Sequence, residues 1–144
     1  MTSGLLLIAT ICAGLFCGAA LYINLVEHPA RVSCGNDLAL REFAPSYHRA
    51  TVMQASLAGV GSLFGLIASW QLSDVRVAAG ALLLGANIPF TLLVIFPTNH
   101  QLLDPALSPQ NFRATELLKR WNRLHAVRTV LSGIGFVVLL LRTI

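Results

Sequence analysis

The sequence predicts an all-α fold, an integral membrane four-helix bundle whose helices run alternately up and down. Two observations lead to this prediction. Of the 144 residues, 56% are hydrophobic and only 11% are charged, whereas soluble domains carry about 25% charged residues. Apolar runs close to the roughly 20 residues that a spanning helix needs recur four times, at about residues 5–27, 47–70, 77–97 and 121–142. We expect a single transmembrane domain over residues 1–144.

Charge and cysteine usage exclude several classes of function. The net charge of +4 is modest, and the chain lacks the dense Lys/Arg clusters of nucleic-acid-binding proteins, so we expect no nucleic-acid partner. The three cysteines form no Cys-x-x-Cys pair, which favours idle thiols over a redox or metal role. Residues 1–26 contain no charged side chain, so the first run lacks the positive start of a cleaved signal peptide and is interpreted as a retained span.

The first span ends in a polar segment that contains Asn24, Glu27, His28 and Arg31. These positions are spaced i, i+3, i+4 and i+7, so they share one helix face if the helix continues past Pro29. We expect Pro29 to loosen or end the helix. One alternative is that Glu27 and His28 cap the span at the membrane interface. The other is that the Glu27 carboxylate pairs with a buried group.

The second span begins with polar residues, and the third contains a proline. Residues 30–46 are interpreted as a loop with a short interfacial helix over 38–43, and Tyr47, Thr51 and Gln54 form a polar stripe at the start of the second span. The connection over residues 71–76 is short, so the second and third spans must be antiparallel neighbours. Pro89 should kink the third span.

The fourth span must include ionisable side chains. The apolar run over residues 129–141 is too short to cross a bilayer, so the helix has to start near Trp121. His125 and Arg128 then lie at membrane depth, where each costs about 2.5–3.5 kcal/mol on insertion scales and usually faces a protein interior. The basic, amphipathic segment 112–123 is interpreted as an interfacial helix that turns into this span.

The distribution of basic residues predicts the orientation. Eight of the ten Lys and Arg residues fall in or beside the two longer connections, and Arg76 and Arg142 fall at the opposite face. The positive-inside rule therefore places the long connections in the cytoplasm and both termini outside. We expect an integral membrane protein of a bacterial inner membrane.

The polar ends of all four spans meet at one membrane face in an up-and-down bundle. The sequence therefore predicts a single polar pocket that opens toward the long connections. The alternative is a purely structural plug in which Glu27 pairs with Arg128 or Arg123 and serves assembly. We expect no cofactor; a metal such as copper or iron would find only His28, His125 and Glu27 as a ligand set.

Several segments resemble the anthrone-oxygenase-like family of small four-span membrane proteins, most of whose bacterial members have no assigned activity. The resemblance covers nearly the whole chain. Its most specific parts are Glu27-His28-Pro29 and the Trp-x-x-x-His-x-x-Arg segment from Trp121 to Arg128; further matches are the segments 18–31, 43–47, 53–54, 89–99 and 120–129. The resemblance implies oxidation of an anthrone to an anthraquinone by molecular oxygen.

That chemistry assigns roles to the residues of the predicted pocket. Removal of a proton from an anthrone gives an electron-rich enolate that reacts with oxygen, and histidine is the residue suited to be the base at neutral pH. The expected catalytic residues are His125 as first choice of base, His28 as second, Arg128 as a cation for the enolate, and Glu27 as a partner of either group. The expected substrate-binding residues are Asn24, Tyr47, Gln54, Asn99 and Trp121.

The sequence thus predicts a membrane oxygenase or oxidoreductase that acts on a small apolar aromatic, anthrone-like or quinone-like molecule with molecular oxygen, in contact with membrane lipid. The rival interpretation is a non-catalytic membrane subunit that binds a lipid, quinone or pigment. A homo-oligomer and a larger membrane complex both stay open as assemblies.

Overall fold

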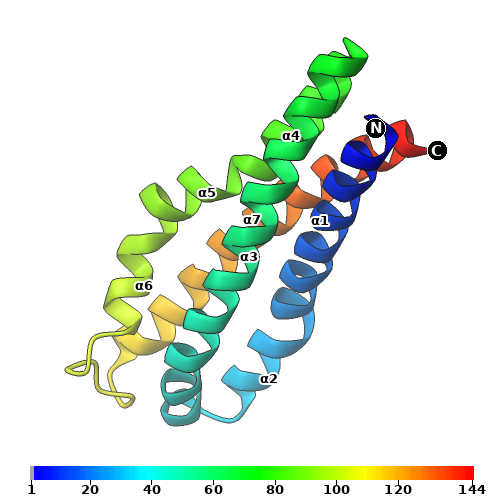
Figure 1. Cartoon of the computed structure of the whole chain (residues 1–144). Helices are drawn as coiled ribbons and strands as arrows, with labels where there is room; N and C mark the ends of the chain where they lie inside the picture. Colours follow the sequence, from blue (N-terminus) through cyan, green and yellow to red (C-terminus); the bar gives the residue numbers. More distant parts are fainter. Residues whose placement is uncertain (1) are drawn as a thin grey trace.

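A computed structural model describes residues 2–144, with side chains from Ser3 onward, and this part of the chain is helical without a strand (Figure 1). The elements in chain order are α1 (Thr2–Tyr22), the π-helix η1 (Ile23–Glu27), α2 (His28–Ser33), α3 (Asn36–Leu72), α4 (Val75–Gly85), α5 (Asn87–Phe90), the π-helix η2 (Thr91–Ile95), α6 (Phe96–Leu102) and α7 (Phe112–Thr143).

These elements combine into four long helices, which confirms the predicted all-α bundle. The continuous segments Ser3–Ser33, Asn36–Leu72, Val75–Leu102 and Phe112–Thr143 are each long and apolar enough to cross a membrane. α1 packs against α3 and α7, and α4 packs against the same two helices. Figure 1 shows both termini at the same end of the bundle, as an up-and-down arrangement requires.

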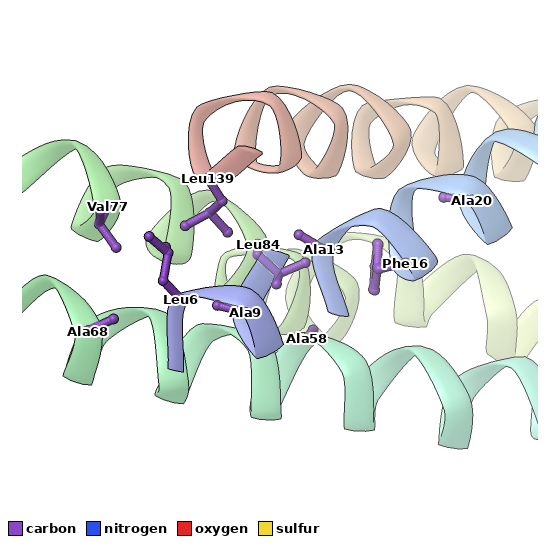
Figure 2. Packing of buried hydrophobic residues seen from close by; sticks show 10 residues of the cluster. All are labelled: Leu6, Ala9, Ala13, Phe16, Ala20, Ala58, Ala68, Val77, Leu84 and Leu139. Carbon is purple, nitrogen blue, oxygen red and sulfur yellow. The ribbon is translucent and has the colours of Figure 1, made fainter. Parts of the chain in front are cut away.

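The end of the bundle that carries the termini has an apolar core. Figure 2 shows side chains from α1, α3, α4 and α7 meeting there, among them Leu6, Val77 and Leu139. Gly61 and Gly65 of α3 lie against neighbouring helices here: a Cβ on either residue would lie 2.6–2.7 Å from side-chain atoms of α1 or α4. Close approach of helix backbones holds this half together.

Of the two outcomes expected at Pro29, the structure shows a loosened helix and not an ended one. The first helix passes through η1 and continues to Ser33. In an α-helix the proline ring would collide with the carbonyl of the residue four positions earlier. Here the His28 amide donates to the Ile23 carbonyl, five residues back, and this wider turn makes room for the ring. The third helix has the same π-turn before a proline: η2 precedes Pro97, and the Phe96 amide donates to the Thr91 carbonyl.

The predicted loop over residues 30–46 is wrong. The connection is only a turn at Cys34 and Gly35, where Gly35 has φ of 89°, and α3 begins at Asn36 with Pro45 inside it. The buried side chains Ala39 and Phe43 explain the longer helix, because this segment packs on a second apolar core.

The third and fourth helices differ from expectation in shape. The third changes direction between α4 and α6 (Figure 1), and its break lies at Ala86, three residues before Pro89. In the fourth, segment 112–123 continues straight into the span as the first turns of α7. Its apolar face, including Leu117 and Leu118, packs on the second core, which removes the need for a turn at the interface.

Candidate functional site

A cavity of about 110 Å³ lies between the two apolar cores. Phe16 and Ala58 of the first core and Phe43 and Ile95 of the second line it. All four long helices contribute polar lining residues: Glu27, Arg31, Ser46, Tyr47, Thr51, Gln54, Asn87, Thr91, Asn99, Trp121, His125 and Arg128. The predicted convergence of polar groups from four helices is confirmed, and the imidazole and guanidinium of the last helix both face inward.

His125 is 1% exposed and lines the cavity. Its Nδ1 lies 3.1 Å from Asn24 Oδ1. Within the described residues, Nε2 takes part in no hydrogen bond. Asn24, expected to bind substrate, is not a lining residue and instead contacts His125 from behind. One ring nitrogen is therefore held by the protein and the other is free.

Arg128 lines the cavity beside Gln54. The Arg128 guanidinium donates to Gln54 Oε1 over 2.7 Å, and its Cζ lies 5.2 Å from the centre of the Phe16 ring. Gln54 is 2% exposed, and its Nε2 and the Arg128 Nε are buried without a partner among the described residues. Two unpaired donors, one of them cationic, therefore sit in the cavity wall.

Glu27 lines the cavity but does not pair with Arg128 or Arg123. It pairs with Arg31 and accepts a 2.8 Å hydrogen bond from the Ser46 hydroxyl. Arg31 also pairs with Glu42 from α3. The alternative of a charge-satisfied plug between Glu27 and Arg128 is therefore wrong, because each group has a different neighbour.

Trp121 separates the two histidines that the sequence singled out. Its indole stacks on His125 with ring centres 4.8 Å apart and on His28 with ring centres 5.5 Å apart. Its Nε1 donates to Asn99 Oδ1 over 2.8 Å. His28 is buried, yet it is not a lining residue of the cavity. The structure thus brings His125 to the cavity and leaves His28 behind the indole.

Two lining groups complete the polar inventory. The Tyr47 ring stacks on Phe43 with centres 5.8 Å apart. Asn87 lies at the break in the third helix, donates to the Leu83 and Leu84 carbonyls, and keeps Oδ1 buried and unpaired within the described chain. Asn87 was not among the expected site residues. Its sequence signal was a lone amide in an apolar run, two residues before a proline.

In the described part of the chain, no three His, Cys, Asp or Glu side chains come together in a way that could hold a metal ion. The set considered from the sequence is divided. Glu27 pairs with Arg31, and Trp121 lies against both His28 and His125.

The cavity is bordered on one side by exposed residues. Thr51 and Ala55 of α3, with Ile88 and Leu92 of the third helix, line it and are exposed, the last two by 36% and 57%. The cavity therefore opens sideways between these two helices, at the apolar surface of the bundle, an opening that the sequence analysis did not predict.

The protein is a bundle of four membrane-length helices around a cavity that opens at its side and is lined by aromatic and polar residues. One imidazole nitrogen in this lining is free within the described part of the chain. Residues 43–138 match the family described as anthrone oxygenase. The chain belongs to this family, and it is an oxygenase-like enzyme.

Two curated relatives agree with this assignment. The anthrone oxygenase of Claviceps purpurea is 24% identical over 147 residues, which cover 91% of this chain and 84% of that protein. The anthrone oxygenase ptaC of Pestalotiopsis fici is 36% identical over 73 residues, which cover 44% of this chain and 52% of that protein. No solved structure matches the chain.

Proposed function

We propose that the protein is an integral membrane oxygenase that converts a small apolar aromatic ketone of the anthrone type to the corresponding quinone with molecular oxygen. One observation carries the proposal: the free imidazole nitrogen of His125 and the unpaired donors of Gln54 and Arg128 line the same cavity. A base and an oxyanion-binding pair are the two groups that formation of an enolate requires.

His125 acts as the general base. Its Nε2 takes a proton from the methylene carbon opposite the substrate carbonyl, and the electron pair moves into the ring system. The carbonyl oxygen becomes an enolate oxygen, on which the negative charge develops. Gln54 Nε2 and the Arg128 guanidinium stabilise that oxygen, and donors of this kind contribute about 10²–10³-fold to a rate.

The enolate then supplies the electrons that oxygen needs. One electron passes to O₂, the resulting carbon radical and superoxide join in a C–O bond, and the peroxide takes the proton from His125. Loss of the second C–H proton breaks the O–O bond and releases water. The balance is one CH₂ group and one O₂ to one C=O group and one H₂O, so the route needs no added reductant.

The shape of the cavity supports entry from the lipid phase. An engineered apolar cavity of about 150 Å³ holds one benzene, so the cavity of about 110 Å³ does not enclose three fused rings. The substrate therefore extends through the side opening between α3 and the third helix. Tyr47 and Trp121 offer flat faces for the rings, and Asn99 fixes the indole through its hydrogen bond.

The orientation follows from the basic residues that remain at the surface. Arg31 and Arg128 lie inside the bundle and are left out of the count. Six basic residues then remain at the end with the two connections, against Arg76 and Arg142 at the end with the termini. The first end faces the cytoplasm by the positive-inside rule.

Oxygen uptake tests the proposal. The protein is purified in lipid nanodiscs, anthrones of differing substitution are added, and the wild type is compared with His125→Ala and Arg128→Ala. We expect one O₂ consumed and one quinone formed per substrate, with both variants at least about 10²-fold slower. Absence of uptake across the panel would contradict the proposal, and a stoichiometric co-purifying pigment would then favour a binding protein. Metal analysis and a chelator arm check that turnover needs no bound metal.

A further inference from the structure

Asn24 has its side-chain amide fixed by the chain around it. Its Nδ2 donates to the backbone carbonyl of Asn122 over 3.2 Å and to Asn122 Oδ1 over 2.8 Å. A backbone carbonyl can only accept, so the amide nitrogen must face it. Asn24 Oδ1 then points the other way, where it accepts from the Thr129 hydroxyl over 2.5 Å.

The orientation of this amide determines where the proton of His125 lies. Asn24 Oδ1 is an acceptor and sits 3.1 Å from His125 Nδ1. The contact is a hydrogen bond only if Nδ1 carries the hydrogen, since an unprotonated nitrogen would face an oxygen lone pair. A neutral imidazole has one N–H, so Nε2 then carries the lone pair.

We infer that Asn24 is a positioning residue that holds His125 in its Nδ1–H tautomer and so leaves Nε2 as the base in the cavity. The inference rests on the proposed function for its catalytic consequence. It assigns to Asn24 a role other than contact with substrate. Asn122 and Thr129 support the same tautomer, because they fix the amide that in turn fixes the imidazole.

The π-helix η1 places Asn24 for this role. Asn24 is the second residue of η1, which packs against α7. The wider turn that accommodates Pro29 therefore also lies where the first helix meets the last, at the level of His125. π-Segments inside α-helices frequently mark functional positions.

Nitrogen NMR of the histidines reads the tautomer directly. Uniformly ¹⁵N-labelled wild type in lipid nanodiscs is measured without substrate, and the His125 signals are assigned as those lost in His125→Gln. We expect a protonated Nδ1 and an unprotonated Nε2. A wild-type spectrum with the hydrogen on Nε2 would overturn the inference, whether or not an Asn24 variant folds.

Kinetics of Asn24→Leu test the consequence. This change keeps the approximate size of the side chain and removes both polar atoms. We expect kcat to fall by about 10²-fold with KM little changed, because a wrongly protonated imidazole still permits binding but not proton removal. The Nδ1–H signal should be lost in the same variant.

Asn36→Leu is the matched control. Asn36 Nδ2 also donates to a backbone carbonyl, that of Pro109, and to a side-chain oxygen, that of Thr115. Asn36 does not line the cavity, so its loss affects stability without changing the His125 signals or kcat. An Asn24→Leu protein that keeps both the Nδ1–H signal and kcat would overturn the inference. If the wild type oxidises no anthrone, the proposed function fails, while the spectrum still decides the tautomer.

Discussion

Arg128 and Gln54 hold each other in the cavity wall through a 2.7 Å hydrogen bond from the guanidinium to Oε1. Because guanidinium groups only donate, the Gln54 carbonyl must face Arg128, and its Nε2 is left without a partner. None of the ion pairs among the described residues includes Arg128. Buried donors without partners are costly to a folded chain, and the enolate oxygen of the proposed reaction would supply the acceptor that both donors lack.

Gln54→Glu tests this relationship. The new carboxylate would pair with Arg128, neutralise the cation and repel an enolate, so we expect kcat to fall by about 10²–10³-fold in the oxygen-uptake assay. The chain offers a matched control at its surface, where Arg113 donates to Gln101 Oε1 over 2.8 Å. Gln101→Glu makes the same change outside the cavity and should leave kcat unaltered. Wild-type turnover in Gln54→Glu would remove Arg128 from the proposed mechanism.

The buried Arg128–Gln54 pair should lower the free energy of unfolding of the protein. Arg128→Met alone leaves Gln54 Oε1 unpaired, which costs about 1–3 kcal/mol. The double change Arg128→Met with Gln54→Leu removes both partners of this hydrogen bond together with their two unpaired donors. Replacement of buried charged groups by apolar ones of similar size often stabilises by about 1–4 kcal/mol.

We therefore expect the double variant to have a higher Tm than the wild type in the same detergent, and no turnover. The equivalent double change at the surface, Arg113→Met with Gln101→Leu, should alter stability by less than about 1 kcal/mol. A double variant that melts below the wild type would show that the pair stabilises the bundle in the absence of substrate.

Much of the fold and part of the site could be predicted from the sequence. Hydropathy predicts four helices of membrane length, and the structure has four helices long and apolar enough to cross a membrane. The short final run over 129–141 required His125 and Arg128 to lie within the last helix, and the structure places both in the cavity. Their spacing with Trp121 puts all three on one helix face.

The remaining features depend on long-range contacts that no local pattern records. Pro29 and Pro97 suggest helix ends, yet a π-turn before each proline makes room for its ring. Only the packing of η1 against α7 shows that the first π-turn places Asn24 beside His125. His28 and His125 look equivalent in the sequence, and it is the indole of Trp121 that separates them. The i, i+4 spacing of Glu27 and Arg31 favours their ion pair. The spacing counts only if the helix continues past Pro29, and that continuation depends on the π-turn.

Asp74 should make the stability of the bundle depend on pH at the end that carries the two termini. It caps α4 by accepting from the Arg76 amide over 2.9 Å and pairs with Arg142 over 2.5 Å. The Arg76 amide, followed by the charges of Arg142 and Arg76, lowers the pKa of this carboxyl below its ordinary value of 3.8. A lowered pKa means that the stabilisation is fully present above pH 3.8 and is lost as the pH falls through the lower folded-state value.

Asp74→Asn keeps a capping oxygen and removes the charge. We expect its Tm to lie below that of the wild type at pH 7. The difference should start to shrink as the pH falls below about 3.8 and vanish below the lower folded-state pKa. Asp104→Asn is the control, since Asp104 accepts from a nearby amide in the same way and takes part in no ion pair among the described residues. A Tm difference for Asp74→Asn that is independent of pH would mean that the charge contributes nothing.

The side opening of the cavity should control access of substrate. Ala55 lies on one border of the opening and lines the cavity, so Ala55→Trp places a large ring across it. We expect KM for an anthrone to rise and kcat at saturation to change little, because the groups that react are untouched. Leu93→Trp is the control: Leu93 is 77% exposed, neighbours the lining residue Leu92, and does not line the cavity. Tm should be unchanged in both variants. Equal KM values in Ala55→Trp, Leu93→Trp and the wild type would show that substrate reaches His125 by another route, and the end of the bundle near Ser46 and Glu27, which also line the cavity, would then be the path to test.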